Sequence, residues 1–323
     1  MLIFQIYSCS LLEKSINLNI TSSSYFFYEK AWGDTQTSDI IVLAIHGYND
    51  YSNSFEKPAN VFSKFNIQTI SFDLRGFGKN YDTGQWFPLE VHLEDVRYFV
   101  KELRRKNQKK KIFLLGESMG GAILLSLASQ KEKLPIEGII LVAPAIWNFS
   151  DSNMYKSFFL KFFSFLFPKF RPSPKGIIKV RPSDNLEMLK KFSDDPLVIH
   201  KPNLNSLRGI VELMDKSYKY SYKYFRNPVY DTLIVIPAID EIVPRTPLLN
   251  IIENENVRNN IGGKILISLH DKNFHMILRD LDGDRVSREI KEWIFNKDEA
   301  RNLSSFKNII NRLENFELFH ILE

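Results

Sequence analysis

The sequence predicts an α/β protein with a mainly parallel sheet, helices on both sides of it and an inserted helical cap. Three observations lead to this fold class. Short runs of β-branched and aliphatic residues alternate with segments of helical periodicity, as in parallel strands joined by helices. The alternation stops over residues 147–228, which are rich in Phe, Lys and Pro. A further strand-like run then begins at Leu233, so the interruption is predicted to be an insertion in one sheet.

Taken in order, the predicted elements form one core. An aromatic segment, Tyr25–Tyr28, predicts an edge strand. Six apolar runs have the length and composition of buried strands: Ile40–Ile45, Ile67–Phe72, Ile112–Leu115, Gly138–Val142, Leu233–Ile236 and Lys264–Leu269. Four segments between or after them have helical periodicity: Phe55–Phe65, Leu89–Arg105, Met119–Gln130 and Arg285–Phe295. We therefore expect a core of residues 25–146 and 229–297, a cap or lid of residues 147–228, and a C-terminal helical extension of residues 298–323.

The N-terminal segment, residues 1–24, allows two interpretations. Its apolar start leads to the single cysteine, Cys9, directly after a small residue, which resembles the remnant of a lipoprotein signal. The stretch is short for a signal peptide and has no basic region before it, so a packed N-terminal strand is favoured. We accordingly expect a cytoplasmic or membrane-associated protein, with export through lipidated Cys9 as the less favoured alternative.

Composition excludes several classes of protein. Hydrophobic residues make up 44% and charged residues 25% of the chain, which excludes a disordered or fibrous protein. One cysteine excludes an internal disulfide and a multi-cysteine metal site. No stretch reaches the roughly 18 uncharged apolar residues of a membrane-spanning helix. The net charge is +5, but the basic residues are scattered, so we expect no nucleic-acid partner.

The strongest functional signal is Gly116-Glu117-Ser118-Met119-Gly120. It follows an apolar strand and opens a helical segment, which is the context of a nucleophile elbow. A serine on such a sharp turn has a strained backbone, and its close neighbours must lack bulk. Gly116 and Gly120 meet that need. Ser118 is therefore the predicted nucleophile.

A nucleophilic serine needs a base and an acid that orients the base, and in such a sheet they follow it in the order acid, histidine. His275 lies in the loop after the last predicted strand and is the predicted base, whereas His270 is interpreted as a structural residue at the end of that strand. Asp240 follows the preceding strand, at the sheet edge where catalytic groups gather. It is the predicted acid, with its neighbour Glu241 as the alternative.

The remaining predicted site residues are the donors of the oxyanion hole. His46-Gly47 follows the first buried strand and can turn the chain so that a backbone N–H faces the serine. We expect the N–H groups of Tyr48 and Met119 to form the oxyanion hole. His46 itself is interpreted as a structural hydrogen-bonding residue.

Together these motifs resemble the α/β-hydrolases of the monoacylglycerol lipase and lysophospholipase group, also described as serine-aminopeptidase-like. The resemblance covers roughly residues 25–297 and rests on five segments in the right order: His46-Gly47, Asp73-x-Arg75-Gly76-x-Gly78, Gly116-x-Ser118-Met119-Gly120-Gly121, Asp240-x-Ile242-Val243-Pro244 and His275-Met276. It implies the α/β-hydrolase fold, a Ser118–Asp240–His275 triad, a cap over the site, and neither cofactor nor metal. The implied activity is hydrolysis of carboxylic esters of single-chain lipids.

Two alternatives stay open at this point. A serine aminopeptidase would need an acidic anchor for the α-amino group of its substrate, and the cap is instead rich in Lys and Arg. A non-catalytic binding protein on the same fold would not need all three triad members. The cap also crowds phenylalanines between residues 158 and 170, Phe162 and Phe163 among them. These rings are expected to be buried, to line an acyl tunnel, or to rest on a membrane surface.

Overall fold

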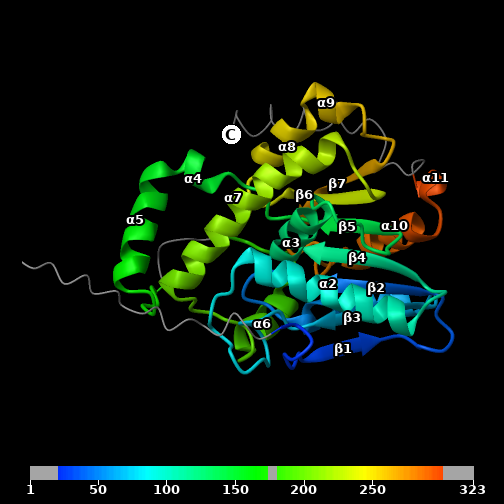
Figure 1. The fold of residues 1–323 in the computed structure, drawn as a ribbon, viewed down its shortest axis with the longest axis horizontal. Coiled ribbons are helices and arrows are strands. Elements are labelled where there is room, and N and C mark those ends of the chain that lie inside the picture. The colour runs from blue at the N-terminus through cyan, green and yellow to red at the C-terminus, as the bar shows by residue number, and fades with distance from the viewer. Residues whose placement is uncertain (1–20, 174–179, 301–323) are drawn as a thin grey trace, which may run out of the picture.

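The computed structural model describes residues 21–173 and 180–300 (Figure 1). Cys9 and most of the predicted C-terminal extension lie outside these residues. The described chain forms a mainly parallel sheet in the order β1-β3-β2-β4-β5-β6-β7, in which only β1 runs antiparallel to its neighbour. The strands are β1 (Glu29–Trp32), β2 (Ile40–Ile45), β3 (Ile67–Phe72), β4 (Lys111–Glu117), β5 (Gly138–Val142), β6 (Thr232–Ile239) and β7 (Ile265–Phe274). This is the predicted α/β-hydrolase fold.

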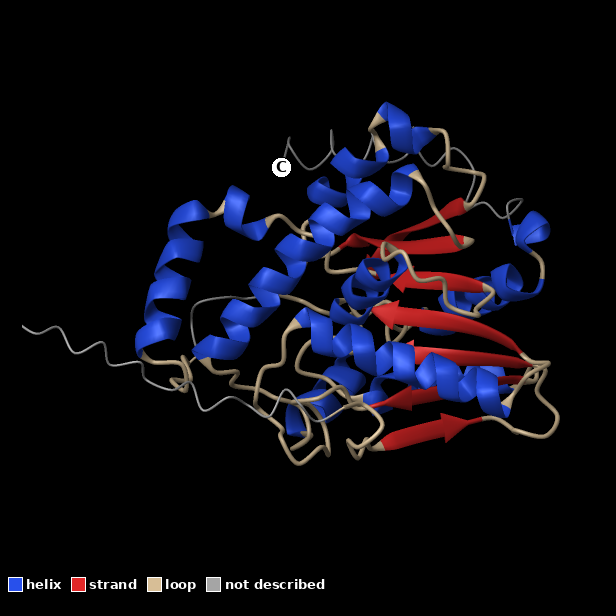
Figure 2. Ribbon diagram, viewed as in Figure 1, coloured by secondary structure: helices blue, strands red, loops and turns tan. Residues whose placement is uncertain are grey.

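Helices cover both faces of the sheet (Figure 2). Side chains of β2 alternate between two cores, since Ile41 and Leu43 face one and Val42 faces the other. The first core is closed by α2 (Leu89–Lys106), α3 (Met119–Ala128) and α8 (Thr246–Ile252), the second by α1 (Glu56–Ser63) and α10 (Gly283–Phe295). Every residue of β2 is buried, which explains its continuous apolar run. Three short helices complete the core: η1 (Ser52–Phe55), α9 (Glu255–Arg258) and α11 (Lys297–Ala300).

Four strand predictions differ in extent from the structure: β4 and β6 extend beyond their predicted runs, and the differences are largest in the first and last segments. Tyr25–Tyr28 is not a strand: Tyr25 and Phe27 are buried as core side chains, and pairing with β3 begins only at Glu29. β7 continues past Leu269 to Phe274, so His270 lies inside the strand and not at its end. Polar residues fit there because β7 is the edge of the sheet and pairs on one side only.

Residues 147–228 contain helices and no strand among their described residues: α4 (Phe149–Ser152), α5 (Met154–Leu166), α6 (Leu186–Asp194) and α7 (Leu204–Arg226). α7 packs on α3, and α4 and α5 lie beyond α7 from the sheet (Figure 1). In the part of the chain that the structure describes, no helix is long and apolar enough to cross a bilayer.

The phenylalanines of α5 are not buried, so the first of the three interpretations of these rings, burial in the core, was wrong. The helix turns Ser157 and Ser164 inward and packs on α7, and both serines are buried. Its rings face solvent and are 45% to 78% exposed: Phe158, Phe159, Phe162, Phe163 and Phe165. The helix is thus amphipathic with its apolar side outward, the reverse of an ordinary surface helix.

Candidate active site

Ser118 occupies the sharp turn between β4 and α3. Its backbone has φ 54° and ψ −114°, a strained conformation for a residue with a side chain. The backbone fits closely around it, since a Cβ on Gly120 would lie 2.0 Å from the Ile45 carbonyl oxygen. A Cβ on Gly116 would lie 2.5 Å from the Gly120 backbone. Only glycine fits at these two positions, as the motif predicts.

The structure brings Ser118, His275 and Asp240 together from three separate parts of the chain. The Ser118 hydroxyl lies 2.9 Å from His275 Nε2, and His275 Nδ1 lies 2.8 Å from Asp240 Oδ2. His275 follows β7 and Asp240 follows β6, at the same end of the sheet as the elbow. A serine in contact with a base that an acid orients is the arrangement that nucleophilic catalysis requires.

Asp240 is held so that one oxygen is free for the histidine. Its Oδ1 accepts hydrogen bonds from the N–H groups of Ile242 (2.8 Å) and Val243 (2.9 Å). Oδ2 remains for His275. The alternative acid, Glu241, is exposed and accepts from the N–H of Arg181 at 2.6 Å. Of the two neighbouring carboxylates, only Asp240 contacts the base.

The electrostatics of His275 suit a base held by a carboxylate. Burial alone would lower the pKa of His275, but the charge and hydrogen bond of Asp240 outweigh it and raise that pKa above its usual value. Glu117 raises the His275 pKa further, and Arg279 opposes this. When Nδ1–H donates to Asp240, the neutral ring presents the Nε2 lone pair to the Ser118 hydroxyl.

His270 faces a different environment. Its Nε2 lies 2.8 Å from Ser268 Oγ and its Nδ1 lies 3.3 Å from Arg285 Nη2. Burial is the main cause that lowers the pKa of His270 to about 4, so the ring is neutral at pH 7. It takes no part in the Ser118 arrangement.

The chain segment after β2 lies directly against the serine. A Cβ on Gly47 would come within 3.3 Å of Ser118 Cβ. His46 holds this turn, because its Nε2 accepts from the Leu74 N–H at 2.9 Å while Nδ1 lies 2.8 Å from the Gly47 carbonyl oxygen. Burial lowers the pKa of His46, which keeps the ring neutral in these bonds. Tyr48 and Met119, the predicted oxyanion donors, are the residues next to Gly47 and Ser118.

A buried charge cluster next to the elbow was not predicted from the sequence. Arg279 Nη2 lies 2.8 Å from Asp50 Oδ2 and 3.4 Å from Glu117 Oε2. All three side chains are at least nine-tenths buried. Glu117 stands inside the elbow motif and Arg279 interrupts an apolar stretch after His275, and these two positions were the available signals.

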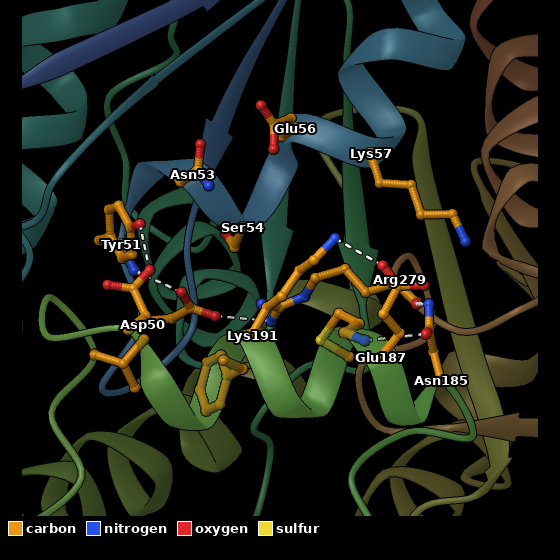
Figure 3. Close-up of a pocket in the computed structure, with 14 residues that line it drawn as sticks. Asp50, Tyr51, Asn53, Ser54, Glu56, Lys57, Asn185, Glu187, Lys191 and Arg279 are labelled. Atoms are coloured by element: carbon orange, nitrogen blue, oxygen red, sulfur yellow. Dashed lines mark hydrogen bonds and ion pairs between the residues drawn. The ribbon is translucent and has the colours of Figure 1, made fainter.

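A cavity of about 310 Å³ opens beside this cluster, between α6 and the η1–α1 segment (Figure 3). Asp50 and Arg279 line it together with Asn185, Glu187 and Lys191. Ser118, Asp240 and His275 do not line it. The cavity is therefore separate from the candidate triad.

A match to a known protein family shows to which family this chain belongs. The family model described as serine aminopeptidase, S33, a hydrolase family, matches residues 36–282, which is most of the chain. The chain belongs to this family. Together with the fold, this places it among the monoacylglycerol lipase-like α/β-hydrolases.

The individual relatives that this chain matches are distant in sequence. The monoglyceride lipases of Rattus norvegicus and Homo sapiens are each 22% identical to it, over 183 and 181 residues. The matches cover 56% and 55% of the chain, and the chain spans 59% of the length of either lipase.

Solved structures share the fold. A monoacylglycerol lipase from Paleococcus ferrophilus has a TM-score of 0.67 at 21% identity, covering 83% of this chain and 98% of that one. A soluble variant of monoglyceride lipase from Saccharomyces cerevisiae, in complex with a substrate analog, has a TM-score of 0.69 at 20% identity, covering 84% and 91%.

Proposed function

We propose that this S33 hydrolase cleaves carboxylic esters of single-chain lipids, such as monoacylglycerols or lysophospholipids, through an acyl-enzyme. The observation that supports the chemistry is the unbroken hydrogen-bond chain from Ser118 through His275 to Asp240 on a nucleophile elbow. The names of its relatives support the substrate class.

In the proposed mechanism, Ser118 Oγ attacks the ester carbonyl carbon while His275 Nε2 takes the hydroxyl proton. Asp240 stabilises the imidazolium that forms. The N–H groups of Tyr48 and Met119 donate to the oxyanion, and each such donor contributes about 10²- to 10³-fold in kcat. His275 then gives its proton to the leaving alkoxide oxygen. A water molecule, deprotonated by the same ring, hydrolyses the acyl-enzyme and restores Ser118.

The outward face of α5 supports the proposal that the enzyme binds its substrate at a lipid surface. Residues 154–171 contain four basic residues and no acidic one: Lys156, Lys161, Lys169 and Arg171. Exposed aromatic rings flanked by lysines are typical of helices that rest in the headgroup region of anionic membranes. Peripheral contact through this helix would bring the cap to its lipid substrate.

Replacing Phe162 and Phe163 together with serine tests the lipid part of the proposal. Burying one phenylalanine is worth about 1.5–3 kcal/mol, so losing two should lower the rate on a long-chain monoacylglycerol in anionic vesicles more than tenfold. Hydrolysis of a water-soluble acetyl ester should stay within about twofold, because Ser118 and His275 are untouched. Vesicle co-sedimentation and initial rates on both substrates measure the two effects.

The matched control is Phe295→Ser, which removes an exposed ring from the end of α10, far from α5 in Figure 1. It should change neither rate. Equal losses on both substrates in the double variant would mean that the rings of α5 only hold the fold. A wild-type enzyme that prefers acetyl esters or aminoacyl amides would contradict the lipid substrate class and favour an esterase or the aminopeptidase.

A further inference from the structure

Residues 181–185 of the insertion, here called the strap, bind the two loops that carry His275 and Asp240. The Pro182 carbonyl oxygen accepts from the N–H of Met276, the residue after His275, at 2.8 Å. At its start, the strap donates the Arg181 N–H to Glu241, the residue after Asp240, at 2.6 Å. The Arg181 guanidinium also lies 4.7 Å from the centre of the Phe274 ring. The strap therefore touches the neighbours of both the base and the acid.

The strap continues along the His275 loop. Asn185 Nδ2 donates to the Arg279 carbonyl oxygen at 3.0 Å, and both residues line the cavity in Figure 3. Asp184 Oδ1 accepts from the Leu281 N–H at 2.8 Å. Backbone and side-chain bonds thus follow one another over the whole length of the strap.

Asp280 is the centre of this contact. Its Oδ2 accepts from the Phe274 N–H at 2.8 Å and from Asn273 Nδ2 at 3.1 Å, the two residues before His275. Its Oδ1 accepts from the Ser183 hydroxyl of the strap at 2.6 Å. Asp280 and Ser183 are both fully buried. The Asp280 carboxylate thus ties its own position to the residues just before His275, and the Ser183 hydroxyl of the insertion donates a further hydrogen bond to the same carboxylate.

Resting on the hydrolase function proposed above, we propose that Asp280 and Ser183 are positioning residues, which hold His275 between Ser118 and Asp240. The helical insertion then has a role in the chemistry itself and is more than a cover over the substrate. Reacting groups displaced by about 1 Å can cost about 10²-fold in rate, so bonds around a loop that ends at the base have a direct effect on turnover. The effect should be the same for every ester, whatever the length of its acyl chain.

The test is Ser183→Ala, with Ser193→Ala as the matched control. Ser193 is an exposed serine of α6 that donates only within its own helix region, to Lys190 and Asp194. Ser183→Ala should lower kcat on a short acetyl ester and on a long-chain monoacylglycerol equally, by about 10- to 100-fold, with KM nearly unchanged. Ser193→Ala should match wild type on both.

The pH profile gives a readout that loss of stability alone would not move. The charged groups that face His275 are Asp240, Glu117 and Arg279, and Asp240 is the main cause of its raised pKa. Because the base must be deprotonated, kcat/KM falls as pH drops through the His275 pKa. If Ser183→Ala loosens the pair with Asp240, that pKa falls and the acid limb of the profile moves to lower pH.

The outcomes separate the two proposals. A wild-type enzyme without turnover on any ester would overturn the hydrolase function. If the wild type is active, Ser183→Ala tests the positioning role. An unchanged kcat on the acetyl ester, or a rise in KM for the long-chain ester alone, would overturn that role. If Ser183→Ala does not fold by circular dichroism, Ser183→Cys decides in the same way, since a thiol fills the place of the hydroxyl but is a weak donor to Asp280.

Discussion

Replacing His275 with alanine should lower kcat/KM for an ester by about 10⁴- to 10⁶-fold, because Ser118 then has no group to take its proton. The Ser118 hydroxyl lies 2.9 Å from His275 Nε2, and no other histidine of the described residues is hydrogen-bonded to it. Initial rates on a short acetyl ester measure the loss without involving the cap. In wild type, the raised pKa of His275 should place the acid limb of the kcat/KM profile above the pH of an ordinary histidine.

His270→Ala is the matched control. It removes a buried histidine five residues earlier, whose partners are Ser268 and Arg285. We expect lower thermal stability and an acetyl-ester rate within about tenfold of wild type, since the ring contacts no group of the triad. The opposite pattern, a large loss for His270→Ala and a small one for His275→Ala, would transfer the role of base to His270.

Asp240→Asn should lower kcat by about 10⁴-fold while leaving the protein folded. The amide keeps the size of the side chain and can still accept from the N–H groups of Ile242 and Val243. If its NH₂ group faces His275 Nδ1, the neutral ring carries its proton on Nε2 and cannot take the one from Ser118. Single-turnover and steady-state rates on the acetyl ester, beside a thermal unfolding curve, measure chemistry and folding separately.

Glu241→Gln is the comparison for that variant. Glu241 accepts only from the Arg181 N–H in the described contacts, and a glutamine can accept the same bond. Its rate should remain within a few-fold of wild type. A loss for Glu241→Gln as large as that for Asp240→Asn would mean that the neighbouring carboxylate, and not Asp240, orients the base.

The central strands were predictable because burial on both faces leaves a clear pattern in the sequence. β2, β3 and β5 begin and end where the apolar runs do. The elbow was predictable for a related reason, since close packing admits only glycine at positions 116 and 120. The loops after β6 and β7 follow from the parallel order of the strands, which brings their ends to one edge of the sheet.

Edges and long-range contacts were not predictable in this way. β1 and the second half of β7 lie at the borders of the sheet, where polar and apolar residues are both tolerated, so their limits leave little pattern. The outward face of α5 has the same composition as a buried helix, and only the packing of Ser157 and Ser164 on α7 distinguishes the two. Contacts such as Ser183 to Asp280, 97 residues apart, have no local signal at all.

The central claim is that Ser118 is a nucleophile activated by His275, and a fluorophosphonate tests it most directly, because the reagent bonds to activated serines whatever their natural substrate. The full chain is incubated with the probe, digested, and the labelled peptide is located by mass spectrometry, with Ser118→Ala treated alongside. We expect one label, on Ser118, which is abolished in Ser118→Ala and strongly slowed in His275→Ala. Labelling that persists in Ser118→Ala, or a folded wild-type protein that takes no label, would contradict it.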